Sequence, residues 1–193
     1  MPKKVDHHKR RITIAEAAIV AIAERGLENV RMVDIARAAG ATTGTVVHYF
    51  PDKDAVLLAA LDAVIQHLLT QIAQSLETAD PIVEVGAALP VNAPMRRDWS
   101  IWLQFWARAV RKPEFGKLHE DYYRTLAAGL ADSMKAKGVT GDAVALADAI
   151  IAVVDGVAVR ATLEPAAWPA TRQIDLLRRL LRPLLAEAGV STS

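Results

Sequence analysis

Six hydrogen-bonding side chains lie within twelve residues of the N-terminal part of the chain: Thr42, Thr43, Thr45, His48, Tyr49 and Lys53. Hydroxyl and imidazole groups can reach base edges in the major groove of DNA, and an ammonium group can pair with a phosphate. A lysine opposes the dipole at the start of a helix, so Lys53 is predicted to serve an anion outside the chain. This group of side chains favours nucleic-acid recognition.

Two short helices must position these side chains. Apolar residues predict one helix over 32–39 and a second over 43–50, and Gly40 between them can adopt the left-handed conformation of a tight turn. Ala36 and Ala39 let the helices cross closely, and Thr42 can cap the second helix. The pattern predicts a helix-turn-helix. The alternatives are an ordinary helix pair and, for His48, a space-filling role against the next helix.

The run from Ala39 to Leu57 resembles the helix-turn-helix signature of the TetR family of transcriptional regulators. The resemblance implies that Thr42, Tyr49 and Lys53 bind phosphates and that Thr43, Thr45 and His48 face bases; Val46 is counted with this DNA-binding face. Two residues depart from the family pattern. Val47 replaces a phosphate-binding tyrosine, and Arg31 replaces a Ser or Thr cap and is expected to supply a phosphate contact.

Aromatic residues gather in the C-terminal part of the chain. Trp99, Trp102 and Trp106 share one helical face, and Tyr122 and Tyr123 follow on the next predicted helix. They are candidates for a ligand pocket that suits a cationic or aromatic effector, with Asp98, Asp121 or Asp155 as the counter-charge. The alternative is that the tryptophan stripe is plain core. This segment resembles the C-terminal domain of BetI, the betaine and choline regulator, and its relatives, which implies an inducer pocket.

The last two predicted helices, over 141–163 and 170–188, are the most apolar. The resemblance implies that they pair with their twins in a homodimer, and the candidate interface residues are Ile151, Val154, Leu177, Leu181 and Leu184. Asp148 and Asp155 interrupt the first of these helices. A buried carboxylate needs a partner, so a structural ion pair with Arg160, Arg178 or Arg179, within the chain or across a dimer, is favoured over a ligand role.

The whole chain reads as an all-α protein of about nine helices, with a loose N-terminal arm of about nine residues. We expect a helix-turn-helix DNA-binding domain over 1–53 and a ligand-binding and dimerisation domain over 54–193. Residues 1–53 hold nine Lys and Arg against six Asp and Glu, and the remainder is mildly acidic. Asp52 is the expected N-cap of a long helix that runs to about Thr78.

Several functional classes are excluded or disfavoured. The chain has no cysteine, which removes disulfides, thiol catalysis and zinc–cysteine sites. No glutamate lies three residues before His48, His67 or His119, so the helical di-metal motif is absent. We therefore expect no enzyme, metal or cofactor, no membrane span and a cytoplasmic location. The predicted function is a dimeric repressor that binds a palindromic DNA operator and releases it with a small-molecule effector. The alternative is a ligand-sensing or partner-binding helical protein that does not bind DNA.

Overall fold

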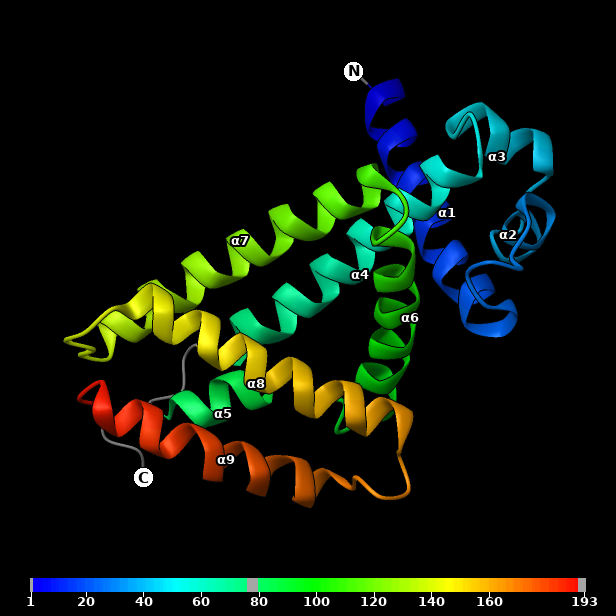
Figure 1. Ribbon diagram of the computed structural model, residues 1–193. Coiled ribbons are helices and arrows are strands. Elements are labelled where there is room, and N and C mark those ends of the chain that lie inside the picture. Colours follow the sequence, from blue (N-terminus) through cyan, green and yellow to red (C-terminus); the bar gives the residue numbers. More distant parts are fainter. Residues whose placement is uncertain (1, 76–79, 191–193) are drawn as a thin grey trace. The chain divides into compact units, whose positions relative to one another are not determined.

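The computed structural model describes residues 2–75 and 80–190, and these form nine α-helices and no strand (Figure 1). The helices are α1 (Pro2–Arg25), α2 (Met32–Ala38), α3 (Thr43–Tyr49), α4 (Lys53–Ser75), α5 (Pro81–Gly86), α6 (Ala93–Ala109), α7 (Pro113–Ala136), α8 (Ala143–Leu163) and α9 (Ala170–Glu187). The all-α prediction is confirmed. The predicted end of the fourth helix, near Thr78, lies outside the described residues.

Capping side chains explain why the helices begin where they do. The Asp52 carboxylate accepts from the Ala55 amide at 2.8 Å, so the predicted cap of α4 is confirmed. Asp142 accepts from the amides of Val144 and Ala145 at the start of α8. The predicted loose arm is wrong, because α1 already begins at Pro2. Proline is well tolerated in the first turn of a helix, and no further proline or glycine follows until Gly26.

The chain divides into two compact units. The first comprises residues 1–67 and 100–118, and the second comprises residues 68–99 and 119–193. In the first unit α2 and α3 pack on α1, as Figure 1 shows. Their shared core includes Ile14, Ile22, Ile35 and Phe50, all fully buried. The predicted domain boundary after Lys53 concerns function rather than packing and stays a prediction.

In the second unit α8 and α9 run side by side, and α5 packs on both (Figure 1). A side chain at Gly86 would bring its Cβ within 3.3 Å of Ile174, so glycine lets α5 approach α9 closely. The fully buried Glu84 pairs with the Lys137 ammonium at 2.7 Å and accepts from the Ser133 hydroxyl at 3.1 Å. This pair joins α5 to the end of α7.

One helix within residues 2–75 and 80–190, α4, is long and apolar enough over Lys53–Ala73 to cross a membrane by length and composition. The core helix of a soluble protein meets the same test. Asp54, Asp62 and His67 lie within this stretch. The expectation that the chain does not span a membrane stays a prediction.

Candidate functional site

The predicted helix-turn-helix is present, and its turn has the expected chemistry. Gly40 has a φ of +57°, which is the left-handed conformation that favours glycine. The Ala41 amide donates to the Ala36 carbonyl at 2.9 Å and closes the end of α2. Thr42 then caps α3, because its hydroxyl accepts from the Thr45 amide at 3.1 Å. The turn and the cap together fix α3 relative to α2.

The exposed side of α3 carries most of the residues predicted to face bases. Thr43 and His48 are exposed and Thr45 is half-buried, with its hydroxyl 2.9 Å from that of Thr42. The space-filling alternative for His48 is wrong, because this side chain lies at the surface. The prediction that Val46 belongs to the DNA-binding face is wrong. This residue is fully buried and holds α3 to the core, so it offers no surface to DNA.

The candidate phosphate-binding residues differ in how they are held. The Arg31 side chain is 74% exposed, with its Nε 3.4 Å from the carboxylate of Asp34. Asp34 also accepts from the Arg31 amide at 3.1 Å. Burial raises the pKa of Asp34, but these hydrogen bonds lower it more, so the carboxylate stays ionised. Arg31 therefore presents a guanidinium group beside the start of α2.

Lys53 has a partner within the chain that the sequence did not predict. Its ammonium donates to the Glu28 carbonyl at 3.0 Å, which offsets part of the unfavourable dipole at the start of α4. Burial and the nearby Arg108 lower the pKa of Lys53. Tyr49 is half-buried, and its ring lies 4.7 Å from that of His7 and 5.1 Å from that of His48. His7 thus belongs to α1 and contacts the end of α3.

Sequence reasoning missed the side chains that anchor the helix-turn-helix. Arg11 of α1 donates to the Tyr49 carbonyl, and its guanidinium lies 4.1 Å above the Phe50 ring. Gln104 of α6 accepts from the Leu27 amide at 2.7 Å. These contacts join residues 38 and 77 positions apart in the sequence, so no local pattern could reveal them.

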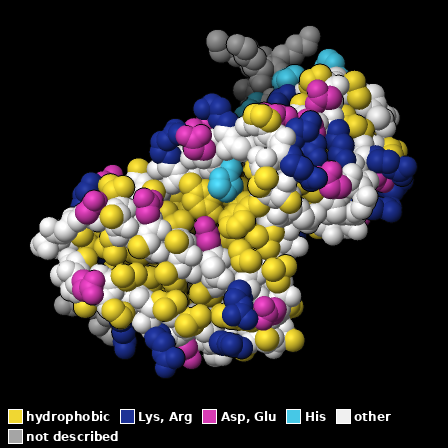
Figure 2. Space-filling model, viewed as in Figure 1, with side chains coloured by type: hydrophobic (Ala, Val, Ile, Leu, Met, Phe, Trp, Pro, Cys, Tyr) yellow, Lys and Arg dark blue, Asp and Glu magenta, His cyan; other side chains and the backbone are white. Residues whose placement is uncertain are grey.

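A cluster of ion pairs, the α6 anchor, comprises Glu28, Asp54, Arg108 and Lys112. Arg108 is largely buried and pairs with both acids, at 3.3 Å to Glu28. Lys112 reaches Asp54 at 3.1 Å. Burial raises the pKa of Asp54, but the hydrogen bonds from Lys112 and Arg108 outweigh this effect, so the pKa lies below its usual value. Figure 2 shows basic and acidic side chains gathered over α2 and the end of α6. The anchor ties the end of α6 to the start of α4.

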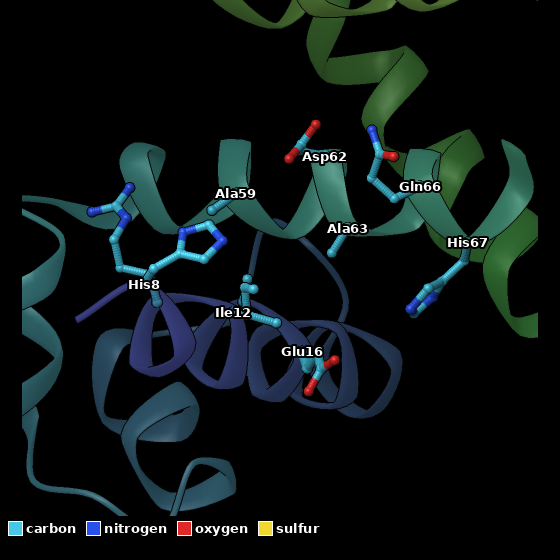
Figure 3. Close-up of a pocket in the computed structure, with 10 residues that line it drawn as sticks. His8, Ile12, Glu16, Ala59, Asp62, Ala63, Gln66 and His67 are labelled. Carbon is cyan, nitrogen blue, oxygen red and sulfur yellow. The ribbon is translucent and has the colours of Figure 1, made fainter. Parts of the chain in front are cut away.

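A groove of about 400 Å³ lies between α1 and α4 in the first unit. Figure 3 shows His8 and Ile12 of α1 facing Ala59 of α4, while Asp62 and Gln66 point away from α1. The remaining lining residues are Arg11, Ala15, Glu16, Ala63 and His67. The groove arises because small alanine side chains line both helices, and no motif in the sequence indicated it.

Four polar side chains lie together in the second unit: His119, Tyr122, Tyr123 and Asp155. The Tyr123 hydroxyl donates to the Asp155 carboxylate at 2.8 Å. The ring of His119 stacks on Tyr123 with a centroid distance of 4.5 Å, and Tyr122 meets Tyr123 edge-on at 5.1 Å. Burial raises the pKa of Asp155 to about 6, although the hydrogen bond from Tyr123 opposes this. Burial also lowers the pKa of His119 and raises that of Tyr122.

The predicted tryptophan stripe divides between the two units. Trp99, in the second unit, is 3% exposed and its indole N–H donates to the Ala88 carbonyl at 2.6 Å. Trp102, in the first unit, is 1% exposed and lies edge-on to Trp106 at 6.5 Å. Burial supports the core interpretation for Trp99 and Trp102. A ligand role for the half-buried Trp106 stays a prediction.

The ion-pair prediction for the acidic residues of α8 needs correction within the described chain. Asp148 is exposed, so its carboxylate stays hydrated and needs no partner. Asp155 is held by Tyr123, while Arg160 pairs with Glu164 at 3.1 Å and Arg178 lies 3.7 Å from Asp175. Arg160 and Arg178 therefore pair with exposed acids that lie three or four residues away in the sequence.

The predicted dimer residues are also placed differently from expectation. Leu177 and Leu181 are fully buried within the chain, so a partner has no surface of theirs to cover, and their assignment to the seam is corrected. Ile151 and Val154 are each less than 10% exposed to solvent, and Leu184 is half-buried. The exposed apolar surface lies beside them. On α9 it includes Leu180, 42% exposed, and Pro183; on α8 it includes Val144, Ala152, Gly156 and Leu163.

Comparison with known proteins identifies both parts of the chain. Residues 14–60 match the model of the bacterial regulatory proteins of the tetR family, and residues 84–186 match that of the BetI-type transcriptional repressor C-terminal domain. The transcriptional regulator PksA of Bacillus subtilis is 33% identical over 86% of this chain and 84% of its own. BetI 2 of Chromohalobacter salexigens is 30% identical over 98% of this chain and 95% of its own.

Solved structures of bacterial regulators have the same fold. A transcriptional regulator from Rhodococcus superposes with a TM-score of 0.85 at 26% identity, over 94% of this chain and 98% of that one. A transcriptional regulator from Saccharomonospora viridis, solved in complex with choline, has a TM-score of 0.77 at 27% identity, over 95% and 98%. These proteins are regulators rather than enzymes, in agreement with the prediction.

Proposed function

Because the chain belongs to the TetR family of bacterial transcriptional regulators, we propose that it is a homodimeric repressor. It binds a palindromic operator through α3 and releases it when a small cationic molecule binds in the second unit. The observation that carries the proposal is the capped helix-turn-helix, which leaves Thr43 and His48 exposed on α3. A dimer places two copies of α3 in successive major grooves, about 34 Å apart.

The DNA-binding roles follow from the chemistry of each side chain. Thr43, Thr45 and His48 contact base edges, and Thr42, Tyr49 and Lys53 contact phosphates together with the exposed Arg31. Phosphate contacts bind any sequence and release counterions, whereas base contacts discriminate between sequences. The Glu28 carbonyl orients the Lys53 ammonium without neutralising its charge.

Substitution of Lys53 by alanine tests the phosphate role. An operator is first selected from random duplexes with the wild-type chain and then footprinted. Lys53→Ala should weaken binding to all duplexes alike and reduce the slope of log K against log salt by about one contact per subunit. Lys135→Ala, a 59% exposed lysine of α7, is the control and should leave the slope unchanged. A changed base preference with an unchanged slope would contradict the assignment, and a footprint without two-fold symmetry would contradict the dimer.

The effector site is proposed around Tyr123 and Asp155. A carboxylate beside tyrosine and histidine rings can hold a cation by charge and by cation–π attraction. Tyr122 and His119 supply two of the rings. The Saccharomonospora regulator, which has the same fold, was solved in complex with choline, and this supports an ammonium ligand here.

Choline is the probe for this site. It should release the selected operator from the wild-type chain, and Asp155→Asn should raise the choline concentration that is required by at least tenfold. The control is Asp132→Asn, which removes an exposed carboxylate from α7 and should leave the response unchanged. If both variants respond like the wild type, the effector site lies elsewhere. If choline releases no operator from any of the chains, the effector is not of this class.

A further inference from the structure

The recognition helix carries an apolar surface that its polar contacts do not explain. Val47 is 48% exposed on α3 and lies one turn after Thr43 and Gly44. Residues three and four positions apart share a helical face. The methyl groups of Val47 and Thr43 therefore flank Gly44 on a surface that we name the methyl patch: Thr43, Gly44 and Val47.

Gly44 has no structural reason to be a glycine. Its φ is not positive, and a Cβ added there would meet only the Thr42 hydroxyl, at 3.8 Å. Glycine is one of the weakest helix formers, so its presence in the first turn of a seven-residue helix works against folding. A missing side chain at an exposed position serves a close approach from outside the chain. Gly44 thus leaves the backbone of α3 open to a close contact from outside.

We propose that Val47, with Thr43, determines operator specificity by contacting a thymine C5-methyl group over the bare backbone of Gly44. Valine has no hydrogen-bonding group, so it cannot bind a phosphate oxygen or a polar base edge. The thymine methyl is the apolar group that base pairs display in the major groove. The inference rests on the proposed DNA binding and adds a specificity that no hydrogen bond supplies.

The test removes single methyl groups from the DNA. Each thymine of the selected operator is replaced in turn by deoxyuridine, which keeps base pairing and loses only the C5-methyl. At one position in each half-site, the replacement should weaken wild-type binding about fourfold, which corresponds to about 0.8 kcal/mol for a buried methyl-sized group. Because both subunits carry the substitution, Val47→Ala should bind the thymine operator about as weakly as the wild type binds an operator in which both of these thymines are replaced, and the replacements should then have little further effect.

Two variants complete the experiment. Val20→Ala truncates a valine of α1 that is also 48% exposed, and it should retain the full response to deoxyuridine. Gly44→Ala should melt at the same or a higher temperature than the wild type but bind the operator more than tenfold more weakly, because its Cβ occupies the close contact.

The outcomes separate this inference from the proposed function. Failure to select any operator would overturn both. A selected operator that wild type and Val47→Ala bind with the same sensitivity to deoxyuridine at every position would overturn the methyl contact and leave the repressor intact. Unchanged operator affinity in Gly44→Ala would overturn the close approach. Salt dependence should be equal in wild type and Val47→Ala, since a lost phosphate contact would reduce the slope instead.

Discussion

Asp155 is an acidic side chain whose charge is costly where it lies. Burial favours its protonated form, and the hydrogen bond from Tyr123 favours the carboxylate; burial prevails, and the pKa rises to about 6. In the unfolded chain the pKa is near 3.8. The native state therefore holds the proton more tightly than the unfolded state, and this group destabilises the fold as the pH rises from about 4 to about 6.

Asp155→Asn should remove this dependence. We expect the variant to gain stability relative to the wild type between pH 4.5 and pH 7, by about 1–2 kcal/mol. Urea unfolding at three pH values measures the difference. Asp132→Asn should show no such gain, because Asp132 is exposed on α7. A gain that is constant with pH would mean that Asp155 titrates normally.

The same titration affects the effector. A cation binds the ionised carboxylate, so choline should bind wild type progressively more weakly below pH 6, by up to tenfold per pH unit. Isothermal titration at pH 5 and pH 7 measures the affinity. An affinity for choline that does not change between these pH values would exclude Asp155 as the counter-charge.

The end of α6 is the element that anchors the helix-turn-helix. The contacts that hold it include those of Gln104 with the Leu27 amide, of Arg108 with Glu28 and Asp54, and of Lys112 with Asp54. Arg108 is the centre of the anchor, with an 11% exposed side chain between two acids. Exposed pairs contribute little to stability, whereas the removal of a largely buried partner leaves charge uncompensated.

Arg108→Gln should therefore destabilise the chain by about 1–3 kcal/mol, with a smaller loss at high salt. Arg111→Gln is the matched control. Arg111 is 67% exposed and lies 3.5 Å from the same Glu28, so we expect a loss of about 0.5 kcal/mol or less. Thermal unfolding at low and high salt compares the two. Equal losses would show that the burial of Arg108 does not matter.

Helix positions were predictable because their signals are local. Asp52, Thr42 and Gly40 act within three residues of their own position. The helices predicted over 32–39, 43–50, 141–163 and 170–188 agree with the observed ones to within about two residues at each end. The anchor was not predictable, since Arg108 and Glu28 are 80 residues apart and charged residues pair in many ways. Val46 was misplaced because the family motif marks it without saying which side of α3 is buried.

At the scale of the whole molecule, the apolar residues of α9 lie on two sides of the helix, one buried and one exposed. Leu177 and Leu181 face the chain's own core, while Leu180 and Pro183 remain at the surface. Periodicity indicates an apolar stripe on this helix but cannot tell which of its residues the same chain covers and which a partner covers, because all of them are apolar. Burial makes the distinction, and it moves the proposed dimer interface to the outer stripe and to the exposed side of α8.

Two adjacent leucines test this assignment. Leu180→Glu should dissociate the dimer and leave the helical monomer folded, since it adds charge to the outer surface. Leu181→Glu should lower the melting temperature sharply, because it buries a carboxylate inside the unit. Analytical ultracentrifugation and circular dichroism separate dissociation from unfolding. A dimer that survives Leu180→Glu would place the interface on another face.

The exposed side of α8 has a consequence for cells that contain several related regulators. Ala152 and Gly156 leave the helix surface almost flat, and a Cβ at Gly156 would meet nothing within its own chain. A flat face admits an equally flat twin at short range, whereas a paralogue with bulky side chains there would be held too far away to form close contacts. We expect the small residues of α8 to act as a barrier to mixed dimers, so that duplicated copies of such a gene can diverge without interfering with one another.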